Sequence, residues 1–403
     1  MSDLLIRRRN LLLRKQEEEM NIRAVCFKAD GEQTVAITKV GSAPTITMQY
    51  SYDGVTWAAW DLSALPFGGS TKVYVRGVGN ERWGSDSNNY NCITFGTGAY
   101  VYVSGIVESL LDGENERLTL SARGALRQLF YQQTALRSAE DLRFEAQNAS
   151  HTAYALMFRD CTNLIYAPKK ISATILSDNA CCGYMFYGCT SLLTAPELPA
   201  TTVGQYCYQY MFYGCTSLVN APKLNAASLP AFCYEYMFRG CTSLVTAPEL
   251  PAEAVGECCY RAMFASCTSL VTAPELPATK LGYSPYRDMF RGCTSLIKAP
   301  SILPATILTG WCYNNMFDGC TSLIDAPELP AETLADNCYW YMFNGCKSLK
   351  TIRCHAKATA KDVTNQWLKG VAATGTFYGH SEYGWGSGTS GIPSGWTFVE
   401  LTD

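Results

Sequence analysis

The chain has 403 residues, which is enough for two or three domains with a large buried core. Charged residues make up only 17% of it, and the formal net charge is −3. A nucleic-acid-binding domain normally carries a basic patch or stripe, so this composition argues against nucleic acid as a partner. No apolar run approaches the roughly 18 residues that span a bilayer, so we expect no membrane insertion.

Residues 1–20 are expected to form a short helix that anchors the chain or joins it to other copies of itself. The leucines of its apolar stripe and the first residues of its basic run are Leu4, Leu5, Leu11, Leu12, Arg7 and Arg8. A basic run followed by an acidic run, here 17–19, suits pairing with another chain, although a frayed tail is the alternative. The segment lacks the apolar stretch of about 7–15 residues found in a secretory signal, so we expect no export by that route.

Residues 21–107 are expected to form a small β-sandwich. Six alternating apolar segments are separated by turns rich in Gly, Asp, Ser and Asn, which is the pattern of such a domain. The segments are 22–29, 34–40, 45–52, 71–79, 91–98 and 99–107. Residues 108–156 form a transition, in which 128–142 can be aligned with the repeat described below as a degenerate capping coil.

The most informative feature is a block of about 26 residues that repeats eight times within 157–354. The cysteine of its G-C-T-S-L step lies at Cys161, Cys189, Cys215, Cys241, Cys267, Cys293, Cys320 and Cys346. A period of 20–29 residues with leucine at fixed offsets is typical of a leucine-rich-repeat solenoid. The Ala-Pro step of each block should keep its strand short, and the C-Y-x-Y-M-F step should form a helical or 3₁₀ turn on the opposite side.

The repeat is closed by 355–403, where 362–373 is expected to be a helix and 392–400 a last strand. The fold class predicted from these elements is an α+β solenoid. It consists of a small N-terminal β-sandwich followed by a capped leucine-rich-repeat solenoid of about eight to nine coils. Such a stack presents a long surface, which favours binding or display over catalysis.

Seventeen of the nineteen cysteines lie in the solenoid, most of them in two repeating columns. The second column stands four residues before each Met-Phe pair, as at Cys207 and Cys233. We interpret both columns as reduced core ladders, because free cysteine behaves as a small, buried hydrophobic residue. Disulfides between coils or metal sites are the alternatives. No C-x-x-C pair with zinc spacing occurs, so we expect no metal site.

Positions that vary between blocks are the candidate surface, and they lie on either side of the Met-Phe pair. The residues chosen from these rows are Arg159, Tyr187, Tyr213, Arg239, Arg291, Tyr184, Tyr210, Tyr236 and Tyr341. Tyr and Arg are enriched at interface hot spots. These side chains either face a ligand or merely cover the edge of the coil. No G-x-S-x-G, H-E-x-x-H or phosphate-loop pattern occurs, so we expect no catalytic residue and no cofactor.

The blocks closely resemble the BspA-like leucine-rich-repeat family of gut Bacteroides-type bacteria and their phages. The resemblance is carried by MFYGCTSL (185–192), APELPA (195–200) and GTSGIPSGWT (388–397), and it covers roughly residues 128–403. Two departures are local: Ser284-Pro285 replaces the second cysteine of one coil, and an extra residue lies between Pro300 and Pro304. The resemblance implies a solenoid, and its bacterial members are typically exported surface proteins implicated in adhesion.

Three functions are considered from this sequence. The leading one is a non-catalytic phage virion component, a fibre or decoration protein, because 4–15 followed by a small β-domain resembles what precedes such repeats in phage structural proteins. Its partners would be other virion proteins through the N-terminal region and a host-surface glycan or protein through the solenoid, with the chain forming a homo-oligomer. The alternatives are a bacterial surface adhesin whose signal was removed and, less favoured, a glycan-acting enzyme on a solenoid scaffold.

Overall fold

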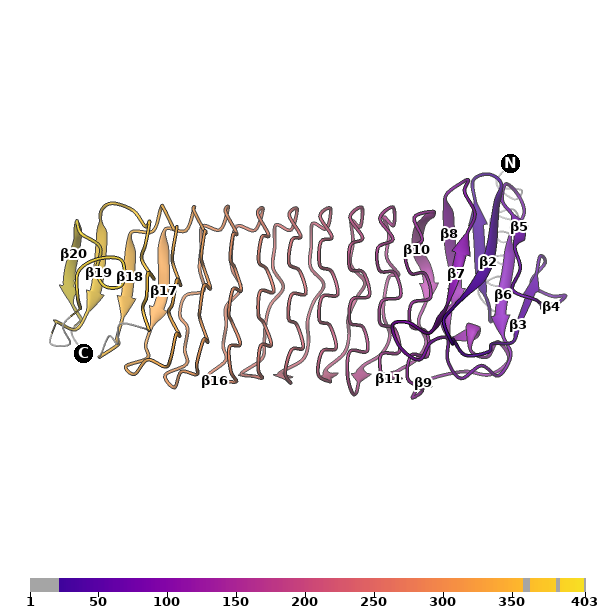
Figure 1. Cartoon of the computed structure of the whole chain (residues 1–403), viewed down its shortest axis with the longest axis horizontal. Helices are drawn as coiled ribbons and strands as arrows, with labels where there is room; N and C mark the ends of the chain where they lie inside the picture. The colour runs from indigo at the N-terminus through magenta and orange to yellow at the C-terminus, as the bar shows by residue number, and fades with distance from the viewer. Residues whose placement is uncertain (1–21, 358–362, 382–384, 402–403) are drawn as a thin grey trace, which may run out of the picture.

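The computed structural model describes residues 22–357, 363–381 and 385–401. The anchor expected at Leu4, Leu5, Arg7, Arg8, Leu11 and Leu12 lies outside them. The molecule is elongated, with a β-sandwich at one end, a stack of coils along its length and a small parallel sheet at the other end (Figure 1). The described residues contain no helix that is both long and apolar enough to cross a membrane.

The sandwich consists of two sheets whose inner faces bury aliphatic and aromatic side chains. Its strands are β1 (Val25–Ala29), β2 (Gln33–Val40), β3 (Met48–Ser51), β4 (Ala58–Trp60), β5 (Leu65–Phe67), β6 (Val73–Gly77), β7 (Tyr90–Phe95) and β8 (Val101–Ile106). One sheet has the order β10-β8-β1-β6-β3-β4 and the other β5-β2-β7. All six expected segments form strands, and the short strands β4 and β5 were not predicted.

The sandwich and the solenoid share a sheet and a core. Strand β10 (Leu136–Arg143) belongs to the first coil, yet it pairs in parallel with β8 of the sandwich. The ring of Phe130 contacts Phe27 of the sandwich at 6.4 Å and Phe158 of the next coil at 5.3 Å, measured between centroids. Residues 128–142 therefore stack on the next coil and continue the sandwich into the repeat.

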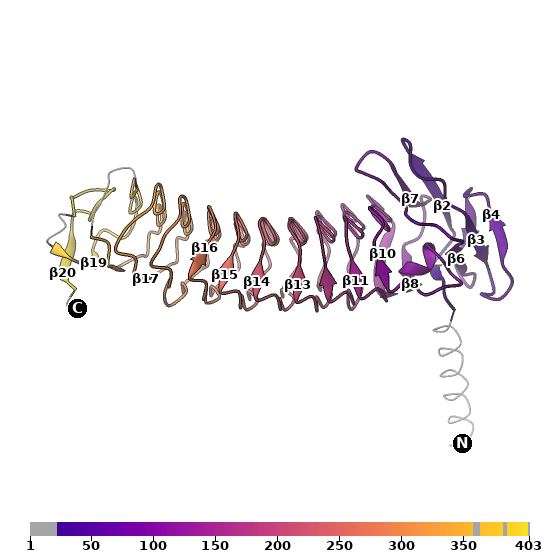
Figure 2. The ribbon, with the colours of Figure 1, turned by 90° about the horizontal axis from the view of Figure 1, so that it is seen from below.

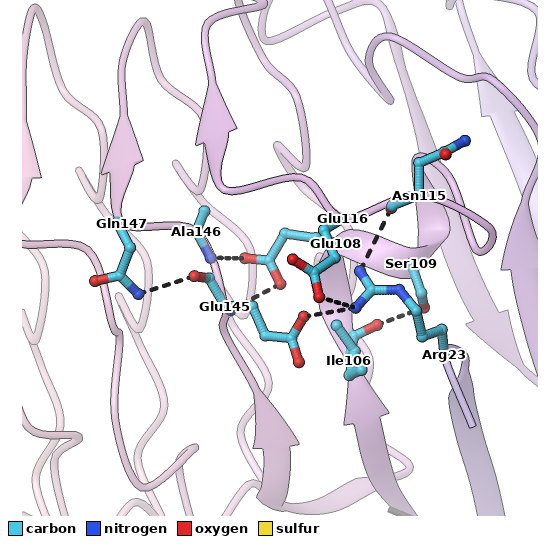
Figure 3. A network of polar contacts seen from close by, with 9 residues as sticks. All are labelled: Arg23, Ile106, Glu108, Ser109, Asn115, Glu116, Glu145, Ala146 and Gln147. Carbon is cyan, nitrogen blue, oxygen red and sulfur yellow. Dashed lines mark hydrogen bonds and ion pairs between the residues drawn. The ribbon is translucent and has the colours of Figure 1, made fainter. Parts of the chain in front are cut away.

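A buried carboxylate strengthens this junction (Figure 3). Glu108 lies in the 3₁₀ helix η1 (Val107–Leu110) and is completely buried. Its carboxylate accepts hydrogen bonds from the backbone N–H groups of Glu145 (3.0 Å) and Ala146 (3.3 Å) and from the Tyr154 hydroxyl (2.8 Å). Burial raises the pKa of Glu108, while these three donors oppose the shift. Arg23 of the sandwich pairs with Glu145 at 3.0 Å.

Seven coils contribute a two-residue strand to parallel ladders along one side of the stack (Figure 2), and the next two coils are joined there by a single bridge between Ile307 and Thr333. These strands are β9 (Thr119–Leu120), β11 (Asn148–Ala149), β12 (Ile175–Leu176), β13 (Thr202–Val203), β14 (Ser228–Leu229), β15 (Ala254–Val255) and β16 (Lys280–Leu281). On another side, the residue before each Ala-Pro step makes a single bridge to the next coil, as in Thr194 to Asn220. Pairing at the Ala-Pro step is thus limited to single bridges in most coils, as predicted, but the five-residue strand β17 (Asp325–Leu329) runs through Ala326-Pro327.

The C-terminal end is a four-stranded parallel sheet. It consists of β17 (Asp325–Leu329), β18 (Thr351–Cys354), β19 (Gly375–Gly379) and β20 (Trp396–Glu400), in that order. The last strand expected in 392–400 is thereby confirmed.

The third side of each coil is a ribbon of consecutive turns, so the α+β prediction is wrong. In one coil, Tyr206 (φ +57°), Tyr210 (φ +56°) and Gly214 (φ +71°) have left-handed backbone, which an α-helix cannot contain. Successive N–H groups bond alternately to the next coil and to the residue three positions back, as Phe212 bonds the Met237 carbonyl and Tyr213 the Tyr210 carbonyl. The ribbon therefore takes its hydrogen bonds partly from neighbouring coils.

The helix expected over 362–373 is also absent from its described part, 363–373. Gln366 (φ +51°) and Gly370 (φ +73°) repeat the left-handed positions of the ribbon, four residues apart. Trp367 is completely buried and stacks on Tyr339 of the preceding coil at 5.9 Å. The segment therefore forms one more ribbon of turns that covers the end of the core.

The core is a set of side-chain columns that run along the stack. Nine phenylalanine rings stack in one column with neighbouring centroids 5.2–5.7 Å apart, namely Phe130, Phe158, Phe186, Phe212, Phe238, Phe264, Phe290, Phe317 and Phe343. Each such stack adds dispersion and burial without any polar cost. This continuity explains why the Met-Phe pair recurs in every block.

The solenoid cysteines are buried, so their prediction as core columns is confirmed. The structure adds a role that the repeat did not reveal. Each thiol of the G-C-T-S-L column donates to the backbone carbonyl of a phenylalanine in the preceding coil, at 2.9–3.1 Å between sulfur and oxygen. A small apolar residue with one weak donor therefore suits this position, where alanine would leave the carbonyl without that partner.

Candidate binding face on the turn ribbon

Seven of the nine predicted surface residues gather on the turn ribbons of four consecutive coils. The inward Met and Phe of each ribbon are completely buried, and these seven residues, which lie on either side of such a pair, are half-buried. One row holds the residues before Met-Phe and the other holds the residues after it. We call this cluster the tyrosine–arginine grid; it consists of Arg159, Tyr184, Tyr187, Tyr210, Tyr213, Tyr236 and Arg239.

The tyrosines of the grid stack on one another from coil to coil. In the first row the Tyr184 and Tyr236 rings each lie 4.6 Å from Tyr210, with interplanar angles of 12° and 21°. In the second row Tyr187 and Tyr213 lie 4.8 Å apart at 3°. Neighbouring rows are also in contact, since the Tyr210 and Tyr213 centroids are 5.7 Å apart. The five rings therefore form one continuous aromatic surface.

An arginine caps each end of this aromatic surface. The Arg159 guanidinium lies 4.7 Å from the Tyr187 ring centroid. The Arg239 guanidinium lies 5.4 Å from Tyr236 and 5.9 Å from Tyr213. A guanidinium stacked on a ring keeps its N–H edge available for carboxylate, sulfate or phosphate groups. The cations therefore both stabilise the stack and mark its two ends.

The grid presents ring edges and hydroxyl groups to solvent. Each inner ring face is covered by the ring of the next coil, so a ligand cannot stack on it. In the described parts of the chain, none of the five hydroxyls hydrogen-bonds another protein group, and none is buried. Burial raises the pKa of Tyr184, Tyr210 and Tyr236 above the ordinary value of 10.0, so these hydroxyls remain neutral donors at physiological pH.

The backbone does not favour tyrosine at the first row. Tyr210 has left-handed φ, a conformation that costs most L-residues roughly 1–2 kcal/mol but that Asn and Asp tolerate. Two later coils place Asp288 (φ +57°) and Asn315 (φ +52°) at the same position. Local conformation therefore does not explain why three consecutive coils have tyrosine at this position. Their stacking and their exposed edges remain as the reasons for them.

Arg291 and Tyr341, the other two predicted residues, lie outside the grid. The rows are interrupted at Ala262 and Ala265, which are buried and carry no polar group. Arg291 pairs with Asp318 at 3.0 Å, and Tyr341 packs against Trp340 at 5.9 Å. The predicted rows therefore do not form one surface along the whole solenoid.

An ion pair with a buried carboxylate, next to the grid, was missed by sequence reasoning. Glu235 is 5% exposed, accepts a hydrogen bond from the Gln209 amide (2.6 Å) and pairs with Arg261 (3.5 Å). The Arg261 guanidinium lies 5.6 Å from the Tyr236 ring, so the pair supports one end of the grid. Burial raises the pKa of Glu235, opposed by these two partners. The sequence did contain a sign of this pair, because Gln209, Glu235 and Arg261 occupy the same position of three successive blocks.

A second surface was also missed, on the side of the coils that carries the Ala-Pro step. One aliphatic side chain per coil is exposed there by 39–47%, at Leu193, Val219, Val245, Val271, Ile297 and Ile324. We call this set the aliphatic stripe. Within the described residues, no group of three or more His, Cys, Asp or Glu side chains is arranged to hold a metal ion.

No family model matches the chain, and no curated protein matches it. A search of solved structures finds similarity to a leucine-rich repeat protein from Bacteroides ovatus. The two chains are 15% identical, the match covers 75% of this chain and 96% of the other, and the TM-score is 0.26. That protein is of the class indicated by the repeat period of this chain, but at this TM-score the likeness carries no argument by itself.

Proposed function

We propose that this chain is a non-catalytic structural and binding protein that displays its solenoid for attachment to a glycan or protein of a host surface. The tyrosine–arginine grid is the observation that carries this proposal. It concentrates five free hydroxyl edges and two guanidinium groups on four coils, although the backbone there would be satisfied by smaller residues. Tyr and Arg on a rigid support are the residues on which binding energy most often depends.

We place this display on a phage virion, as a fibre or as a capsid or tail decoration protein that assembles in the host cytoplasm. The resemblance of the repeats to phage-borne members of the BspA-like family supports this placement. In the proposal the N-terminal region contacts other virion proteins and further copies of the chain. The shared sheet and core at the sandwich–solenoid junction would then hold the grid at a fixed position relative to that attachment.

The binding role is tested with variants whose replacements already occur in this solenoid. Tyr184, Tyr210 and Tyr236 are changed together to Asn, the residue at the equivalent position 315, and the fluorescent full chain is added to host cells. Tyr341→Asn is the matched control, because it makes the same change outside the grid. We expect the triple variant to lose at least tenfold in cell binding and the control to bind like the wild type. Equal binding by all three proteins would refute the role of the grid.

The location is tested by mass spectrometry of purified phage particles and, separately, of host envelope fractions. Stoichiometric peptides of this chain in the particles are the expected result. Peptides found only in the envelope, beginning downstream of a cleaved leader, would contradict the virion placement and support a bacterial adhesin.

A further inference from the structure

We propose that the ligand of the tyrosine–arginine grid is an extended acidic polysaccharide that crosses the coils, with acidic groups at Arg159 and Arg239. This inference rests on the proposed binding function and specifies its ligand. It follows from three properties of the grid: its ring faces are covered, the groups it exposes are hydrogen-bond donors, and its outward groups repeat once per coil.

The covered ring faces exclude a common mode of sugar recognition. A neutral sugar normally places its C–H face on an aromatic face, and the amphipathic tyrosine ring suits that contact. Here Tyr210 has a ring at 4.6 Å on each side, the Arg159 guanidinium lies 4.7 Å from the Tyr187 ring, and the Arg239 guanidinium lies 5.4 Å from the Tyr236 ring. Recognition must therefore depend on the polar edges of the grid.

Those edges donate hydrogen bonds and carry positive charge. The five hydroxyls have no acceptor within the described chain, and burial raises the pKa of Tyr184, Tyr210 and Tyr236. Arg239 contacts rings and, in the described residues, forms no ion pair, whereas Arg159 Nε bonds Asp160 at 3.3 Å. Two other acidic groups act on the grid: Glu235 is paired with Arg261, and Asp288, whose charge reaches Tyr236, is paired with Arg287 and Arg291. The Arg239 guanidinium is therefore left without a carboxylate partner among the described residues, which favours an anionic, acceptor-rich ligand.

The spacing favours a glycan over a peptide. Equivalent ring centroids lie 4.6–4.8 Å apart along the rows, and three coil steps separate Arg159 from Arg239, or about 15 Å at roughly 5 Å per coil. An extended peptide rises about 3.3 Å per residue and alternates its side chains, so its groups fall out of step with the rows. An extended chain of pyranose rings advances by nearly one ring per coil, so successive rings meet the hydroxyl pairs of Tyr184 with Tyr187 and of Tyr210 with Tyr213, and then Tyr236 with Arg239.

The test uses two polymer pairs with the same sugar backbone, one member acidic and the other neutral: polygalacturonate with its full methyl ester, and dextran sulfate with dextran. Binding of the full chain is measured by calorimetry at low and high salt. We expect at least one acidic polymer to bind, with affinity that falls as salt is added, and its neutral counterpart to bind at least tenfold more weakly. Arg239→Ala, which copies the residue at position 265, should lose at least tenfold in affinity, while Tyr341→Asn should lose none.

The outcomes separate this inference from the proposed function. Equal binding of a polymer and its neutral counterpart would show that charge is not recognised and would overturn the inference. So would a folded chain that binds host cells through the grid but binds none of the four polymers; in that case the proposed function stands with another ligand. A chain that binds neither polymers nor cells would defeat both.

Discussion

Replacing Tyr210 by asparagine should weaken binding while leaving the solenoid folded. Two effects on stability oppose each other. The left-handed position (φ +56°) costs tyrosine roughly 1–2 kcal/mol and asparagine less, so the substitution relieves about 1 kcal/mol of backbone strain. It also removes two stacked contacts at 4.6 Å, each worth about 0.5–1.5 kcal/mol. The net loss of unfolding free energy is therefore about 0–2 kcal/mol.

Guanidinium-induced unfolding followed by circular dichroism measures this loss, and the cell-binding assay measures function on the same protein. Tyr341→Asn is the control for both, since Tyr341 (φ +55°) has the same left-handed backbone and its ring stacks beside Trp340 rather than in the grid. If Tyr210→Asn lowers the free energy of unfolding by more than about 3 kcal/mol, the loss exceeds what the two stacked contacts can supply even without any relief of backbone strain. The row would then be mainly structural. Unchanged binding would refute the argument that the tyrosine edges contact a ligand.

Three further predictions concern the core. Phe238→Ala should lower the free energy of unfolding by about 3–5 kcal/mol, measured by denaturant unfolding, because the ring is completely buried. A loss below about 1 kcal/mol would contradict the core column. Burial raises the pKa values of Cys259 and Cys293 from 9.0 to about 12. As pH rises above 9, the unfolded state therefore loses these protons before the folded state does. Between pH 9 and 12 each thiol should lower the free energy of unfolding by roughly 1.4 kcal/mol per pH unit. An unfolding midpoint unchanged from pH 8 to 10 would argue against buried thiols. Glu108→Gln turns an amide N–H₂ toward a group that itself donates a hydrogen bond, so it should lower the free energy of unfolding by about 1–3 kcal/mol, measured by thermal unfolding. The control Glu197→Gln, on the exposed face, should leave the free energy of unfolding unchanged.

The core of the solenoid could be predicted from the repeat because each buried position recurs in every coil. Phe238, Cys241 and Leu244 have equivalents in each block, and all three are completely buried. Only a column at the centre of a stack needs the same residue in each copy. The sandwich strands were predictable for a related reason, since their alternation of apolar and polar residues follows the two faces of a sheet.

The turn ribbon could not be predicted from the same pattern. A helical turn and a ribbon of turns would both bury a Met-Phe pair and expose its neighbours, so spacing alone does not separate them. The difference lies in the backbone, where hydrogen bonds go to the next coil and left-handed residues recur at every fourth position. Gly214 and Asn315, both suited to positive φ, were the local signs of it.

The residues of the candidate site could be predicted from the sequence, but their arrangement in space could not. The variable rows contained every member of the grid, yet the stacking that covers the ring faces depends on the distance between coils. The pair of Glu235 with Arg261 joins residues 26 positions apart, so only the stacking of adjacent coils brings it together. The break in the first row at Ala262 could not be predicted for the same reason, because it matters only once the side chains of adjacent coils are stacked.

Hydroxyl-radical footprinting of the full chain, with and without host-surface material, tests the central claim most directly. It measures the solvent reactivity of each tyrosine separately. We predict that Tyr187, Tyr210 and Tyr213 lose reactivity in the bound state, while Tyr283 and Tyr166, which are 54% and 43% exposed, keep theirs. Unchanged reactivity across the grid, with protection of the aliphatic stripe instead, would show that the solenoid binds through its other face.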